Sequence, residues 1–184
     1  MRIIILLMIL GMAVWACTPG EGPSGNAGTP SASRLKKDIK ALEKKLAAQP
    51  AGQLDTVAAR QLVAQTEVLF ANYPTDEATG ALLFRAADVA RSTGDFEKAI
   101  VLWGQVNRQY PNYERAAEAI FLQGFSADQD LRDLGRAKRF YRYFIQKYPE
   151  HELVKDANLL LSYIESDKSP EDLIKLFENQ NVTE

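Results

Sequence analysis

Tyr-Pro pairs recur at nearly constant spacing along the chain, and this period constrains the fold more than any other feature. The pairs Tyr73-Pro74, Tyr110-Pro111 and Tyr148-Pro149 lie 37 and then 38 residues apart. Each pair follows an amphipathic stretch and precedes a new Ala-rich one. Repeats of this length are typical of solenoids built from helical hairpins, which present extended binding surfaces. The period therefore predicts an all-α helical-hairpin solenoid of about three repeats, and it directs the search toward binding rather than catalysis.

The composition leaves few residues for catalysis or metal binding. The 184-residue chain is long enough for one domain with a real core, and its formal net charge of -2 does not indicate nucleic-acid binding. The only cysteine is Cys17 and the only histidine is His151. Zinc sites built from His and Cys clusters and intramolecular disulfides are thereby excluded. Because no carboxylate pair stands in apolar surroundings, we expect no catalytic residue, no metal and no cofactor.

The first 16 residues have the pattern of a secretory signal. A basic residue precedes an apolar run of about a dozen residues, which is short for a permanent membrane span. The following segment, Val14-Trp15-Ala16-Cys17, resembles a bacterial lipobox, although Trp15 stands where a smaller residue is usual. The resemblance implies that residues 1–16 are removed as a lipoprotein signal peptide. It also implies that Cys17 is lipidated with acyl chains such as palmitate. An ordinary secreted protein is the alternative.

Residues 17–33 connect this signal to the remainder of the chain. They are rich in Gly, Pro, Ser and Thr and show no apolar periodicity, so we expect a flexible tether with a span on the order of 20 Å. Thr18 is not the aspartate that is associated with inner-membrane retention in enteric bacteria. We therefore expect a lipid-anchored protein of the bacterial cell envelope, with the outer membrane, facing the periplasm, as the favoured location.

Residues 34–48 are expected to form a basic amphipathic helix. Its apolar residues are spaced by four, three and four positions, and lysines and an arginine occupy most of the remainder. Three interpretations stay open. The helix packs as the first helix of the solenoid, forms a short coiled coil between copies, or rests on anionic lipid near the anchor. The apolar residues are Leu35, Ile39, Leu42 and Leu46.

Self-alignment of the repeats predicts which positions pack together. Ala87, Gly124 and Ser162 fall at one small position, where a small side chain lets the two helices of a hairpin approach closely. Further along, Ala99 aligns with Ala137, and the aromatic pair Trp103 and Tyr141 follows four residues later.

The same alignment predicts the ends of the helices. Asp55 is expected to cap a helix that runs to about Asn72, with Val57 in its buried stripe. Gly94 and Gly135 are expected to end the first helices in the left-handed conformation. The extra residue of the second repeat is placed in a loop over 128–133. A short closing helix is expected over 173–177.

The pattern of small residues, alanines and a terminal proline resembles the tetratricopeptide repeat. The resemblance covers about Leu54 to Phe177, within a repeat domain placed at 54–184. Its departure is the length of 37 to 38 residues with Tyr-Pro at the end. That variant is similar to the repeat lipoprotein of the outer-membrane β-barrel assembly machinery, to the Tol–Pal-associated periplasmic repeat protein, and to small repeat lipoproteins of Bacteroidota.

The resemblance implies that the first helix of each repeat lines a concave groove that binds peptides. Exposed aromatic residues with flanking charges suit an extended or helical peptide. For the phenylalanines of the first two repeats, burial between stacked hairpins is the competing interpretation. The candidate groove residues are Phe84, Asp88, Arg91, Phe121, Phe125, Asp128, Leu159 and Tyr163.

The expected function is that of a non-enzymatic scaffold for envelope proteins or peptides, held to the membrane by its lipid anchor. Outer-membrane protein assembly is one context that the resemblance suggests. A Tol–Pal or cell-wall adaptor that oligomerises through residues 34–48 is the alternative, and a glycan-binding envelope protein is a further one. Nucleic acid is not expected as a partner, and neither the partner's identity nor the oligomeric state follows from the sequence.

Overall fold

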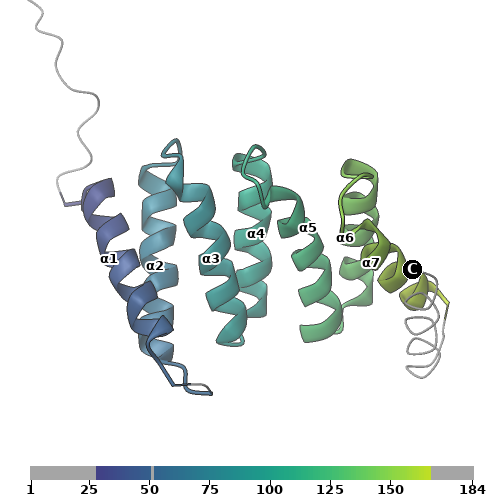
Figure 1. The fold of residues 1–184 in the computed structure, drawn as a ribbon, viewed down its shortest axis with the longest axis horizontal. Helices are drawn as coiled ribbons and strands as arrows, with labels where there is room; N and C mark the ends of the chain where they lie inside the picture. The colour runs from purple at the N-terminus through teal and green to yellow at the C-terminus, as the bar shows by residue number, and fades with distance from the viewer. Residues whose placement is uncertain (1–27, 51, 167–184) are drawn as a thin grey trace, which may run out of the picture.

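The chain folds into a single array of antiparallel helices. The computed structural model describes residues 28–50 and 52–166, and within them it holds seven α-helices, one π-helical turn and no strand. Figure 1 shows the helices standing side by side, each packed mainly on the helices before and after it. This confirms the all-α hairpin solenoid. The elements are α1 (Ala32–Ala47), α2 (Thr56–Asn72), α3 (Ala78–Ser92), α4 (Phe96–Gln109), α5 (Ala116–Phe125), η1 (Ser126–Asp130), α6 (Leu134–Lys147) and α7 (Val154–Glu165).

The Tyr-Pro pairs mark the ends of the second helices. Tyr73, Tyr110 and Tyr148 are the C-caps of α2, α4 and α6, with nearly identical backbone angles of φ -136, -126 and -130° and ψ 56, 57 and 60°. The proline that follows each tyrosine disfavours the helical conformation before it, which ends the helix at that point. The Tyr110 hydroxyl donates to the carbonyl of Pro74 at 2.6 Å, so it joins one Tyr-Pro turn to the previous one.

Aspartates begin three of the helices. The side chains of Asp55, Asp95 and Asp133 accept hydrogen bonds from backbone N–H groups three residues on, at 2.9, 3.3 and 2.9 Å. Such caps satisfy amides that have no partner in the helix. Gly94, just before Asp95, has φ 81°, as expected. Its counterpart before Asp133 is Arg132 with φ 56°.

Two predictions about this second hairpin were therefore wrong. Gly135 lies inside α6 and does not end the preceding helix, because the aspartate that caps α6 comes two residues before it. The inserted residue is not held in a loop over 128–133 either, because the helix continues into η1. A π-helical turn takes one extra residue per turn, so the chain absorbs the insertion without leaving the helix.

Small and large residues alternate in the core as the self-alignment predicts for the first two repeats. Ala87 is fully buried, and a Cβ atom at Gly124 would lie 2.8 Å from the Tyr141 ring. Trp103 and Tyr141 are among the largest fully buried side chains. Ser162, at the corresponding position of α7, is exposed, since no second helix of that hairpin falls within the described residues.

The first two helices form a hairpin of the same kind. Leu35 and Ile39 of α1 are buried, and Leu42 and Leu46 pack against the same core cluster. The apolar stripe of α1 is thus used within the chain, which removes the surface on which a coiled coil between copies depends. Val57 was wrongly placed in the buried stripe of α2, since it is 63% exposed.

Several predictions fall on residues outside the described ranges. These are the signal over 1–16, the lipidation site Cys17, the part of the tether over 17–27 and the closing helix over 173–177. The remainder of the tether ends earlier than expected, because Ser31 caps α1 and Ser33 already belongs to the helix.

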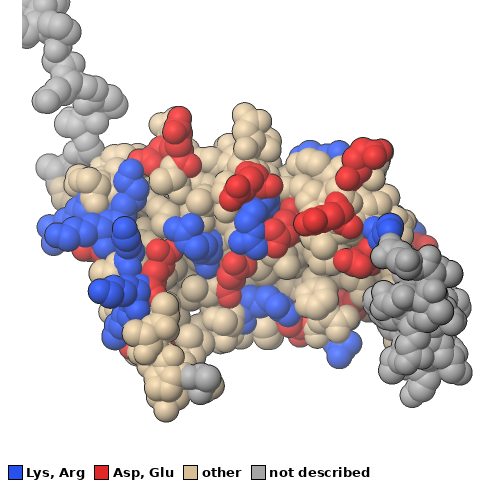
Figure 2. Space-filling model, in the orientation of Figure 1, with Lys and Arg blue, Asp and Glu red and all other residues tan. Residues whose placement is uncertain are grey.

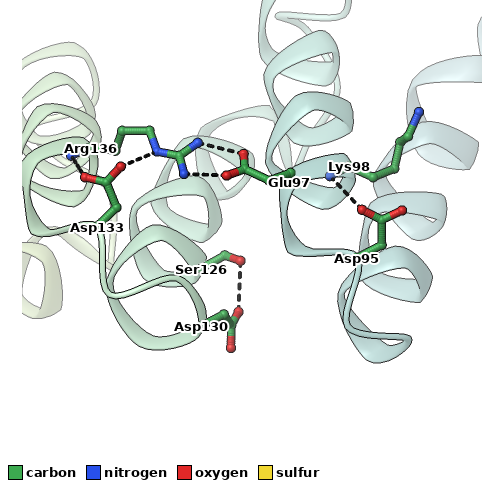
Figure 3. A network of polar contacts seen from close by, with 7 residues as sticks. All are labelled: Asp95, Glu97, Lys98, Ser126, Asp130, Asp133 and Arg136. Carbon is green, nitrogen blue, oxygen red and sulfur yellow. Dashed lines mark hydrogen bonds and ion pairs between the residues drawn. The ribbon is translucent and has the colours of Figure 1, made fainter.

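Ion pairs join alternate helices along the array. Arg85 of α3 pairs with Glu43 of α1 at 2.6 Å, and Lys98 of α4 pairs with Glu67 of α2 at 2.7 Å. Figure 3 shows the guanidinium of Arg136 between the carboxylates of Glu97 and Asp133, with closest distances of 2.6 and 2.7 Å. These pairs between alternate helices join residues 42, 31 and 39 positions apart, so they link successive hairpins at the surface.

Candidate functional site: the groove between α3 and α5

A cavity of about 300 Å³ opens where α3 approaches the end of α5, with α4 beneath it. Residues from four elements meet there because α4 follows α3, precedes α5 and packs against both. Figure 2 shows acidic and basic side chains interspersed over the middle helices of the array. The cavity is lined by Asp88, Arg91 and Ser92 of α3, Phe96 and Trp103 of α4, Leu122 of α5, and Asp130 of η1. We refer to it as the α3–α5 pocket.

Arg91 and Asp130 form one wall of the α3–α5 pocket. Arg91 donates two hydrogen bonds to the Asp130 carboxylate, at 2.6 and 3.1 Å, and Ser126 donates a further one at 2.8 Å. Burial pushes the pKa of Asp130 up, but the hydrogen bonds from Arg91 and Ser126 leave it lowered overall. The Arg91 guanidinium also lies 5.2 Å from the centre of the Phe125 ring. Both charges of this wall are therefore already satisfied within the protein.

A second pair of charges lies beside the α3–α5 pocket. Arg115 donates two hydrogen bonds of 2.6 Å to Glu118, one turn along α5. Its guanidinium carbon lies 3.8 Å from the centre of the Phe84 ring, so it covers that buried ring from outside. The pKa of Arg115 is raised, mainly by the hydrogen bonds to Glu118. This arginine is also engaged and is not left as an open binding group.

Asp88 differs from these charges. It forms no ion pair with another described residue, and the hydrogen-bond donor that faces it is the indole N–H of Trp103. The residue is exposed, but the partial burial of its carboxyl group still raises its pKa, an effect that Arg115 and the indole N–H of Trp103 oppose only in part. The α3–α5 pocket thus holds one carboxylate that no cation of the described residues pairs with directly.

Trp103 brings a buried hydrogen-bond donor to the α3–α5 pocket. Its side chain is 1% exposed, and its indole nitrogen has no hydrogen-bond partner among the described residues. The indole N–H lies close enough to Asp88 to favour the charged carboxylate. Asp88 is therefore the acceptor that faces this buried donor, at a contact outside normal hydrogen-bond geometry.

The structure brings together only some of the predicted groove residues. Asp88 and Arg91 line the α3–α5 pocket, and Phe125 stands beside it under Arg91. Phe121 is half-buried and packs against Phe125 and the rings of the second core cluster. Tyr163 of α7 is half-buried as well and packs against that cluster.

Three predicted groove residues do not line an open groove, which corrects the sequence interpretation. Phe84 is 0% exposed and Asp128 is 2% exposed. Leu159 is 7% exposed. Phe84 and Leu159 pack in the core, as an apolar side chain does on the inner side of a helix. Asp128 turns inward because the π-helical turn shifts its direction relative to the α-helical alignment.

Sequence reasoning missed the other groups around the α3–α5 pocket. Trp103 was placed correctly as a buried aromatic, but nothing in the sequence indicates that its N–H lacks an acceptor. Asp130 reaches Arg91 only because of η1. The pair Arg115 and Glu118 could have been found, since opposite charges three residues apart on a helix are neighbours.

Comparison with known families places the repeats on these hairpins. The family model described as the tetratricopeptide repeat matches residues 81–113 and 118–151. The first match spans most of α3 and all of α4, and the second spans most of α5, then η1 and α6. These two hairpins are therefore similar to tetratricopeptide repeats, and the α3–α5 pocket lies where the two matched segments meet. A search of curated proteins finds no match.

The described part of the chain offers neither a metal site nor a membrane-spanning helix. Over 28–50 and 52–166, no group of three or more His, Cys, Asp and Glu side chains could hold a metal ion. Within the same ranges, no helix is long and apolar enough to cross a membrane.

Proposed function

We propose that this tetratricopeptide-repeat protein is a non-catalytic scaffold that holds another protein in the groove between α3 and α5. Tetratricopeptide repeats generally bind proteins or peptides, and the two matched repeats are the ones that form this groove. The observation that carries the proposal is the α3–α5 pocket itself, which includes Asp88, a carboxylate that forms no ion pair with another described residue. Polar groups left unsatisfied in a cleft are typical of binding sites rather than of packing surfaces.

The chemistry of the groove favours binding over catalysis. The two arginines beside Asp88 are held by bidentate hydrogen bonds to Asp130 and Glu118. No nucleophile is paired with a base within the α3–α5 pocket as described. A groove of this kind can recognise side chains, and neither arginine is left open to act on a substrate.

The scaffold is further proposed to be anchored in the bacterial envelope, most consistently at the outer membrane facing the periplasm. The support is the sequence alone, namely the apolar run over 1–16 and the lipobox-like segment that ends at Cys17. The tether would enter the array at α1, so the groove would lie about two helices away from the anchored end. Outer-membrane protein assembly remains one context for such a scaffold.

The exposed side of α1 bears on this proposal. Figure 2 shows basic side chains gathered over α1 at one end of the array. The helix carries six basic and two acidic residues, although the whole chain is slightly acidic. Because this end adjoins the tether, the basic side of α1 is suited to lie near anionic headgroups. The adaptor alternative loses support, since it requires the apolar stripe that α1 uses to pack on α2.

Site-specific photo-crosslinking in bacterial cells tests the scaffold proposal. A photoreactive amino acid replaces Ser92 at the α3–α5 pocket in one strain and Val101, which is 50% exposed on α4, in a matched control strain. We expect irradiation to give a discrete protein adduct from position 92 and none from position 101. Equal adducts from both positions, or none from position 92, would overturn the proposal.

A further inference from the structure

The α3–α5 pocket has the size and lining to take a single side chain of a bound protein. Its volume of about 300 Å³ is at the lower end for a small-molecule site, where whole ligands of drug size are enclosed. Phe96, Trp103 and Leu122 contribute apolar side chains to its lining, and Asp88 contributes a carboxylate. This combination matches a long side chain with an apolar stem and a polar tip.

The charges around the α3–α5 pocket decide the sign of that tip. Arg91 and Arg115 are the cations nearest to Asp88, and each already binds another carboxylate through two hydrogen bonds. The charged groups are three carboxylates and two guanidinium groups, so together they carry one negative charge in excess, and Asp88 is the carboxylate without a bound arginine. They are Asp88, Asp130, Glu118, Arg91 and Arg115. A cation at Asp88 would complete the balance, whereas a carboxylate there would add to the repulsion.

Trp103 supports the same conclusion. Its buried N–H faces the Asp88 carboxylate but meets no acceptor at normal hydrogen-bond geometry. When a cation draws Asp88 fully into its charged form, the carboxylate has oxygens for both the ligand and the indole N–H. The bound state would then give Asp88 an ion pair and strengthen its hydrogen bond from the indole N–H.

We propose that the α3–α5 pocket binds a basic side chain, lysine or arginine, of the partner protein, with Asp88 as its acceptor and Phe96, Trp103 and Leu122 as the walls for its stem. This inference rests on the scaffold function proposed above and names the chemistry that the groove recognises. Asp88 acts by direct contact with the ligand, and Arg91 and Arg115 keep their own carboxylates and leave Asp88 free.

The test uses the full chain, purified in detergent micelles, with Trp15→Phe, so that Trp103 is the only tryptophan. The probes are blocked pentapeptides, acetyl-Ala-Ala-X-Ala-Ala-amide, in which X is arginine, lysine, citrulline or glutamate. Binding at millimolar peptide is followed by the shift of the Trp103 indole N–H signal in nitrogen-15 NMR spectra. We expect saturable shifts with arginine and lysine and none with citrulline or glutamate.

Variants separate the role of Asp88 from general electrostatics. Asp88→Asn keeps the shape of the side chain and is expected to weaken arginine-peptide binding about tenfold or more, as for a lost charged hydrogen bond. Glu114→Gln removes an equal charge from an exposed residue outside the α3–α5 pocket and is expected to leave binding unchanged. Thermal unfolding of both variants checks that they are folded. Asp88→Ala is a second variant that lacks the carboxylate acceptor.

The outcomes distinguish this inference from the scaffold proposal. Equal binding of the arginine and citrulline peptides, or wild-type binding by both Asp88 variants, would overturn the assignment of a basic side chain. If the adduct at position 92 still forms in that case, the scaffold function stands without it. If the peptides require Asp88 but no adduct forms at position 92, the pocket chemistry stands and the scaffold function falls.

Discussion

Replacing Gly124 with alanine tests the close contact between the two helices of the second matched repeat. Alanine in place of glycine within a helix ordinarily adds about 1 kcal/mol of stability. At Gly124 the new Cβ would lie 2.8 Å from Cδ1 and from Cε1 of Tyr141, and 3.3 Å from Cβ of Phe140. Tyr141 is fully buried against Phe121 and cannot swing away. Forcing a methyl group into such packing costs about 1–3 kcal/mol, so we expect a net loss of about 1 kcal/mol.

Gly135 provides the matched control for this substitution. It lies in α6 of the same hairpin, and the atom nearest to a Cβ added there would be 3.4 Å away, an ordinary contact. Gly135→Ala is therefore expected to raise stability by up to about 1 kcal/mol. For a chain of this size, a gap of about 2 kcal/mol between the variants corresponds to about 4–8 °C in Tm. Thermal unfolding followed by circular dichroism at 222 nm measures it. A Gly124 variant as stable as the Gly135 variant would refute the close approach of the helices.

Three further predictions concern the anchor, the groove and the ion pairs. Cys17→Ser should move the protein from the membrane to the soluble fraction of fractionated cells; retention in the membrane would contradict lipidation. Asp88→Asn should raise Tm at pH 7, because burial raises the pKa of Asp88 and its charge costs free energy above that pKa. The gain in Tm should vanish near pH 3, below the ordinary aspartate pKa of 3.8, because Asp88 is then protonated in both the folded and the unfolded state. A gain that does not change with pH would contradict the charge of Asp88 as its cause. Glu97→Gln removes the bidentate partner of Arg136, and we expect a loss of up to about 1 kcal/mol that shrinks in 1 M salt; an equal loss at all salt concentrations would contradict an ionic contribution.

The sequence was sufficient for the features that repeat. Tyr73, Tyr110 and Tyr148 end their helices alike because each precedes a proline, and this is a local effect that the sequence carries directly. The small residues at Ala87 and Gly124 were recognisable for a similar reason. Helix packing requires a small side chain at one position of each hairpin, so the requirement recurs with the period.

The sequence was insufficient where one repeat departs from another. The insertion after Gly124 could be placed in a loop or in a widened helical turn, and only the structure shows the π-helical turn η1. That choice turns Asp128 inward and brings Asp130 to Arg91, so it determines the wall of the α3–α5 pocket. The sequence also does not show that Asp88 lacks an ion pair. This depends on the two neighbouring arginines, which bind Asp130 and Glu118 instead.

The most direct test of the account measures the adduct at position 92 in cells that also carry a substitution in the groove. The central claim is that a partner protein is held between α3 and α5 through Asp88. With the photoreactive residue at position 92, the adduct should be lost when Asp88→Asn is added and retained when Glu114→Gln is added. An adduct of unchanged yield in the Asp88→Asn strain would contradict the claim.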